Sequence, residues 1–176
     1  MPKVVFEGLI KGVRGQIGDL IYRLMPDGST VVSRAPRKKK RKFSRKQKAH
    51  QHRFGEAAAY AREAAEEHPI YAGLAAAAPM KTAYNFAVSD WWHPPVIRRI
   101  ERKDGHILVE ATDNVMVARV QVSILDRGGK TVEKGEATRR EDDWWEFASA
   151  SSTPGTTVIA EAWDLPGHVT KEVTIA

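Results

Sequence analysis

A basic segment from Arg34 to Arg53 most constrains how this 176-residue chain can fold. It holds eleven Lys and Arg residues and no Asp or Glu. Without it, 17 basic residues would face 22 acidic ones, and the net charge of +6 would become −5. Because like charges at successive positions repel, residues 36–43 are predicted to form an extended arm rather than a packed element. The pI of about 9.6 therefore reflects one segment of an otherwise acidic chain.

A helix is predicted to begin directly after this arm. Ser44 and Gln47 have the spacing of a capping box, and alanine is abundant up to Glu67. Basic residues fill the first turns and acidic residues the last, which opposes the helix macrodipole. A bound polyanion or an acidic protein surface would offset this cost. We therefore expect the arm to become ordered on such a surface, and a solvated linker is the alternative.

Residues 1–35 predict a β-hairpin. Two β-prone runs flank Asp27-Gly28, which has the residue types of a tight turn. A third strand is expected from residues 4–10, because two strands alone are only marginally stable. Glycines at positions 12, 15 and 18 match neither a phosphate-binding loop nor a dinucleotide-binding fingerprint, so they predict a turn or bulge.

Two shorter helices are predicted over 70–78 and 80–90, because prolines at 69 and 79 interrupt an alanine-rich stretch. Trp91 and Trp92 follow, just before two prolines. Adjacent tryptophans at this point predict packing between the helical part and the next domain. An exposed aromatic recognition patch is the alternative.

From Val96 the chain changes to short strands separated by turn residues. Apolar residues occupy alternate positions, most clearly over 116–124, and turns recur about every ten residues. This spacing predicts an immunoglobulin-like β-sandwich of about seven strands. The expected strands cover 96–103, 106–112, 116–125, 131–138, 144–149, 156–163 and 168–175.

The predicted fold class is therefore α+β, with three domains. The first is the hairpin region, 1–35; the second is the basic arm and helical segment, 36–95; the third is the immunoglobulin-like sandwich, 96–176. No apolar run approaches the roughly 20 residues that span a bilayer, and the N-terminus lacks a secretory signal. We expect synthesis in the cytoplasm, with residence there or in a particle such as a virion; signal-independent export is the alternative.

No motif for catalysis, a metal or a cofactor is present. Cysteine is absent, no GxSxG or HExxH occurs, and His50 and His52 lie on different faces of the expected helix. We therefore predict a protein that is not an enzyme, with no cofactor and no small-molecule substrate. The acidic run Glu141-Asp142-Asp143 predicts a solvated loop; binding of a cation or of the basic arm is the alternative.

Several segments resemble a group of bacterial and phage proteins of about this size. They are GVRGQIGDLIYR (12–23), DGSTVVSRAP (27–36), RKQKAHQHRF (45–54) and AYNFAVSDWWHPP (83–95). The C-terminal part resembles the immunoglobulin-like modules of prokaryotic surface proteins and phage structural proteins. The resemblance implies the architecture, and it supplies no catalytic residues and no activity.

The charge distribution favours a non-enzymatic structural protein that self-assembles into a filament, appendage or virion component. Its basic arm would dock on the acidic surface of a neighbour, giving a homo-oligomer or polymer. The alternative is a nucleic-acid-binding protein without sequence specificity, which contacts DNA or RNA phosphates. In both cases the expected contacts are Arg34, Arg37, Lys38, Lys39, Lys40, Arg41, Lys42, Arg45, Lys46, Lys48 and Arg53.

A third hypothesis is a carbohydrate- or surface-binding module built on the sandwich. Trp144 and Trp145 would point to opposite faces of a strand, so one enters the core and the other faces outward. The outward tryptophan, or Trp163, would supply a stacking platform. The aromatic contact candidates are thus Trp91, Trp92, Trp144 and Trp145.

Overall fold

The computed structural model describes residues 3–4, 14–36, 42–78, 80–150 and 156–175. The chain divides into two compact units, an N-terminal unit (Met1–Phe86) and a sandwich unit (Ala87–Ala176). The division into three domains at residues 35 and 95 stays a prediction. Within the described ranges, no helix has both the length and the apolar character needed to cross a membrane.

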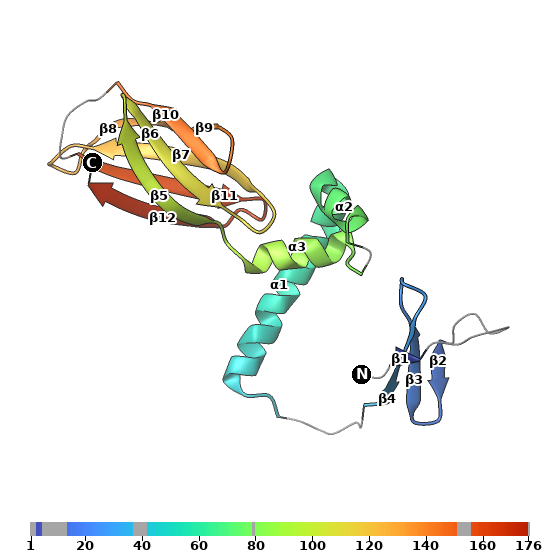
Figure 1. Ribbon diagram of the computed structural model, residues 1–176. Helices are drawn as coiled ribbons and strands as arrows, with labels where there is room; N and C mark the ends of the chain where they lie inside the picture. Colours follow the sequence, from blue (N-terminus) through green and yellow to red (C-terminus); the bar gives the residue numbers. More distant parts are fainter. Residues whose placement is uncertain (1–2, 5–13, 37–41, 79, 151–155, 176) are drawn as a thin grey trace. The chain divides into compact units, whose positions relative to one another are not determined.

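The N-terminal unit contains an antiparallel sheet with the strand order β1-β4-β3-β2 (Figure 1). The predicted hairpin is formed by β3 (Leu20–Leu24) and β4 (Thr30–Arg34), and Gly28 takes a φ of 79° in its turn. A strand near the N-terminus, β1 (Lys3–Val4), pairs with β4. It overlaps the predicted third strand, 4–10, at Val4, and the rest of that prediction lies outside the described residues. A fourth strand, β2 (Gly15–Ile17), was not predicted, because its glycines are typical of turns.

In the part of the chain that the structure describes, three helices follow: α1 (Arg45–Glu67), α2 (Pro69–Ala76) and α3 (Ala83–Trp92). The predicted capping box begins α1: the Gln47 amide donates to Ser44 Oγ at 3.2 Å, and the Ser44 amide donates to Gln47 Oε1 at 2.8 Å. The Tyr60 and Tyr71 hydroxyls, 2.8 Å apart, join α1 to α2. Local signals therefore define where α1 begins, and Pro69 starts the next helix.

The sandwich unit consists mainly of two four-stranded antiparallel sheets (Figure 1). Their strand orders are β5-β6-β10-β9 and β12-β11-β7-β8, and we call them sheet B and sheet C. The predicted strands agree with the observed ones to within a few residues, except that 131–138 becomes two strands. The bounds are β5 (Val96–Lys103), β6 (His106–Thr112), β7 (Val117–Leu125), β8 (Thr131–Glu136), β9 (Thr138–Arg139), β10 (Trp144–Ala148), β11 (Thr157–Asp164) and β12 (Val169–Ile175).

The core lies between the two sheets because each central strand alternates buried with less buried side chains. At Gly135 a Cβ would lie 2.7 Å from Cε2 of the buried Phe147, so the aromatic ring fills the place of a side chain there. The fully or nearly fully buried members from the central strands include Ile107, Val109, Ala111, Val120, Val122, Ile124, Val158, Ala160 and Ala162.

Candidate functional site

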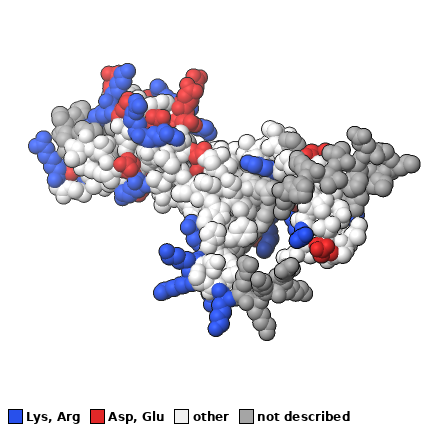
Figure 2. All heavy atoms as spheres, turned by 60° about the horizontal axis from the view of Figure 1, so that its bottom comes forward, with Lys and Arg blue, Asp and Glu red and all other residues white. Residues whose placement is uncertain are grey.

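The first half of α1 is exposed on every side. Each residue from Arg45 to Glu56 is solvent-exposed, and we call this stretch the basic half-helix. Lysine and arginine side chains project from the first turns of α1 in Figure 2. Its first turn contains no acidic residue, so the side chains add to the positive end of the helix dipole. The half-helix therefore presents positive charge in several directions at once.

Helical spacing distributes these charges over two faces. Arg45, Lys48 and His52 follow an i, i+3, i+7 pattern, whereas Lys46 and Arg53 lie on a neighbouring stripe. His52 Nδ1 lies 3.6 Å from Glu56 Oε1 at the end of the half-helix. A ligand that wraps the helix, or two ligands, would contact both stripes.

Phe54 is a large apolar residue within this polar surface. It lies three and four positions before Ala57 and Ala58, which begin the buried stripe of α1 with Ala61 and Ala64. Phe54 therefore continues the buried face of the helix, yet half of it (50%) is exposed. The packing surface of α1 extends beyond the part that the chain itself covers.

The other predicted basic contacts are placed as follows. Arg34 ends β4 and is exposed, and Lys42 is exposed before the helix. Residues 37–41, which hold Arg37, Lys38, Lys39, Lys40 and Arg41, lie outside the described residues.

Trp91 and Trp92 are partly buried at the end of α3. Their rings pack edge to face with centroids 5.6 Å apart, and Trp91 meets the His168 ring at 5.4 Å. His168 follows β11 in the loop before β12. Trp91 therefore packs against the loop before β12 within the sandwich unit, and packing between the helical part and the next domain stays a prediction.

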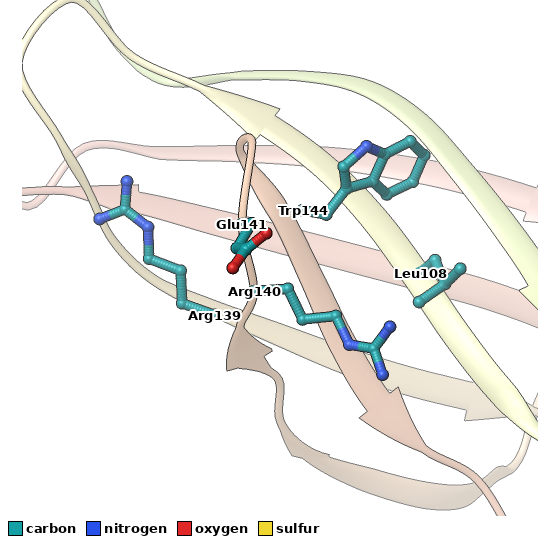
Figure 3. Close-up of a pocket in the computed structure, with 5 residues that line it drawn as sticks. All are labelled: Leu108, Arg139, Arg140, Glu141 and Trp144. Carbon is teal, nitrogen blue, oxygen red and sulfur yellow. The ribbon is translucent and has the colours of Figure 1, made fainter.

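Trp144 and Trp145 point to opposite faces of β10, as the alternation predicted. Trp145 is 6% exposed in the core, whereas Trp144 lies on the outer face of sheet B. Beside it is a hollow of about 770 Å³. Figure 3 shows the Trp144 ring and the Arg140 guanidinium on either side of Leu108, with Arg139 extending the other way. The hollow is lined by Leu108, Arg139, Arg140, Glu141 and Trp144.

Asp164 carries a buried carboxylate that the sequence patterns did not predict. The Asp164 side chain is 0% exposed; its Oδ1 accepts from the His168 amide at 2.6 Å, and its Oδ2 lies 2.8 Å from His168 Nδ1. Burial raises the pKa of Asp164 above its ordinary value of 3.8, the contacts with His168 oppose this shift, and the charge of Asp113 adds to it. The position of Asp164 before the Pro166-Gly167 turn could have predicted the backbone hydrogen bond, because Asp side chains often accept from the backbone in such turns.

We predict that Asp164→Asn changes how stability depends on pH. Because the folded-state pKa is raised, the folded protein holds this proton more tightly than the unfolded chain. That contribution is complete below pH 3.8 and is lost as pH rises through the folded-state pKa. The unfolding free energy of the native protein should therefore fall relative to the variant over this range. Urea unfolding of both proteins at a series of pH values measures this difference. If the unfolding free energies of the native protein and the variant change with pH in parallel, the prediction is contradicted.

Among the described residues, no three His, Asp or Glu side chains are grouped to hold a metal ion.

No protein-family model and no curated protein matches the chain. Among solved structures, CopC from Methylosinus trichosporium OB3b is 19% identical, with a TM-score of 0.37; the match covers 45% of this chain and 87% of CopC. An engineered protein is 21% identical, also with a TM-score of 0.37, over 46% of this chain and 18% of that protein. Similarities of this size carry no information about the function of this chain.

Proposed function

We propose that this protein is a non-enzymatic structural protein that self-assembles by docking its basic half-helix on the acidic surface of a neighbouring copy. The observation that carries the proposal is the exposure of every residue from Arg45 to Glu56. A helical stretch of this length is marginal in water without packing, and this one adds like charges at the unfavourable end of the dipole. A negatively charged partner would remove both costs.

The turn between β9 and β10 is the proposed acceptor on the neighbour. Glu141, Asp142 and Asp143 are all exposed there, and Asp142 and Asp143 take φ values of 54° and 64° in a tight turn that displays their carboxylates. The adjacent Arg140 is engaged elsewhere, since its Nε lies 2.6 Å from Glu146 Oε2. Contact between unlike patches on two copies generates rings or filaments.

The outer face of sheet C offers a second contact for assembly. Val169, Val173 and Ile175 are 52%, 51% and 79% exposed on the edge strand β12. Val173 extends this surface onto β11 through its cross-strand pair with Ile159. Exposed apolar side chains concentrated on one sheet face are typical of interaction surfaces.

An immunoglobulin-like fold for the sandwich belongs to the same proposal. The orders β5-β6-β10-β9 and β12-β11-β7-β8 correspond to strands A-B-E-D and G-F-C with an added C′ strand. This agreement in strand order supports the assignment, and no cystine is needed for it. Modules of this kind suit a filament, appendage or virion because their faces and edges can stack in series.

Particle size against ionic strength tests the assembly proposal. At about 50 mM salt, where the Debye length exceeds 10 Å, the protein should form oligomers. At about 1 M salt, the charged contact is screened, and the particles should become smaller. Sedimentation velocity and negative-stain electron microscopy measure both states. A single monomeric species under both conditions would refute self-assembly.

Nucleic-acid binding is the second candidate, and the pairing of carboxylates on the sandwich unit favours it. Glu101, Glu110, Glu136, Glu146 and Glu161 each lie within 4 Å of a basic side chain of the same unit. Fewer carboxylates are therefore open to a neighbour's arm, whereas the phosphates of a nucleic acid would contact the lysine and arginine side chains of the half-helix. Retardation of duplex DNA and RNA at about 50 mM salt is the test, and no retardation would end this candidate.

A further inference from the structure

The outer face of sheet B carries a groove that shares only Glu141 with the proposed acceptor turn. The hollow beside Trp144 adjoins a second one of about 330 Å³, because both are lined by Leu108 and Arg140. Trp144 is level with Glu110 on β6, and His106 lies four residues back along that strand. At about 3.3 Å per residue, the groove runs roughly 13 Å along the sheet.

One end of the groove is an aromatic platform. Trp144 lies on the outer face, and Leu108 lies on the same face, near enough for both to line one hollow. Figure 3 shows that no labelled side chain crosses the indole ring. The core neighbour Trp145 fills the structural role of an aromatic in β10, so the packing of the core does not account for Trp144.

The other end of the groove is polar, and its groups are held in place by one another. Glu146 lies between Arg140, with Nε at 2.6 Å, and His106, with Nε2 at 3.6 Å. His106 Nδ1 is also 3.0 Å from the Asp104 carbonyl oxygen. Such pairing restricts the rotamers of these side chains while leaving other donors and acceptors open, which favours binding of a hydroxyl-rich ligand.

The charges that line the groove balance. Three basic side chains (Lys103, Arg139 and Arg140) face three acidic ones (Asp104, Glu141 and Glu146). This balance disfavours nucleic acid, which needs an excess of positive charge. Two apolar residues are too few for a lipid-like ligand, whose surface must be covered mostly by apolar side chains.

We propose that this groove binds a neutral, extended oligosaccharide of β-1,4-linked pyranose rings with equatorial hydroxyls. Such a ring presents a face of C–H groups, which stacks on the Trp144 indole, while its hydroxyls bond with Arg140 and Glu146. The extended saccharide chain would follow the groove along β10 and β6. The site uses no residue of the basic half-helix, and of the proposed acceptor turn it includes only Glu141.

Calorimetric titration of the full chain with cellohexaose and with hexa-N-acetylchitohexaose, both neutral, tests the proposal. At least one should bind at concentrations up to about 5 mM, a range that includes complexes with a Kd near 1 mM. Trp144→Ala should weaken binding about tenfold or more. The matched control is Trp163→Ala, which removes an aromatic from the outer face of sheet C, where Arg119 lies 4.1 Å from the ring centroid. This control should bind like the native protein.

A second variant, Arg140→Gln, keeps Trp144 and changes a 57% exposed side chain, so folding is preserved. It should also weaken binding several-fold, since its guanidinium no longer donates to the sugar. The proposal is overturned if neither saccharide binds, or if Trp144→Ala and Trp163→Ala bind equally. Titrating at about 1 M salt separates it from the assembly, because a neutral ligand should bind there as well as at low salt.

Discussion

Replacing Arg45, Lys46, Lys48 and Arg53 together with glutamine is expected to weaken self-association between about 4-fold and about 700-fold at low salt. Each exposed ion pair contributes about 0.2–1 kcal/mol, and 1.4 kcal/mol corresponds to a tenfold change. Glutamine retains helix propensity, so α1 should persist. Sedimentation equilibrium measures the association constant. If nucleic acid is the partner, the same variant should reduce the salt slope of binding by up to about 3.6.

A matched variant controls for net charge. Changing Lys81, Arg127, Lys130 and Lys134 to glutamine removes the same charge from other exposed positions. This control should associate like the native protein, because the contact depends on the half-helix rather than on total charge. Equal association by both variants and the native protein would refute the docking role of the arm.

The second large effect concerns the core of the sandwich unit. Ile124→Ala is expected to lower the free energy of unfolding by about 2–5 kcal/mol, because the removed atoms leave a cavity. Ile124 is 0% exposed on β7 and pairs across the sheet with Val158, which is equally buried. All five tryptophans lie in Ala87–Ala176, so tryptophan fluorescence during urea unfolding follows this unit alone.

Ile175→Ala is the control for this measurement. The residue type is the same, but Ile175 is 79% exposed at the end of β12. Its replacement should change the unfolding free energy by about 0.5 kcal/mol or less, as for most surface substitutions. Equal losses from the two variants would mean that Ile124 does not belong to the cooperative core.

Much of the fold follows from short-range patterns. Ser44 and Gln47 predicted the start of α1, because a capping box is satisfied by residues three apart. The alternation in 116–124 predicted β7 and its buried face, since side chains in a strand alternate between the two sides of the sheet. Each of these signals can be read without knowing what lies on the other side of the element.

Other features could not be read in this way. The Gly15–Ile17 strand exists because β3 offers it an edge, although its glycines alone indicate a turn. Alternation predicted that the side chains of Trp144 and Trp145 point to opposite faces of β10. No local pattern determined which of the two enters the core. That choice follows from the register of β10, which sets Trp145 opposite Val109 and places Trp144 outside.

The sequence alone determined the charge of the basic arm, the start of the helix that follows it, and the succession of strands along the chain. These features depend on charge, helix capping and side-chain alternation, which act between residues close together in the sequence. Only the tertiary structure decided which sheet each strand joins, and hence the groove beside Trp144 and the buried carboxylate of Asp164. Those features depend on residues brought together from distant parts of the chain. Leu108 and Arg140 line the same hollow, and the charge of Asp113 helps to raise the pKa of Asp164. Their free energy comes from burial and pairing that no single segment contains.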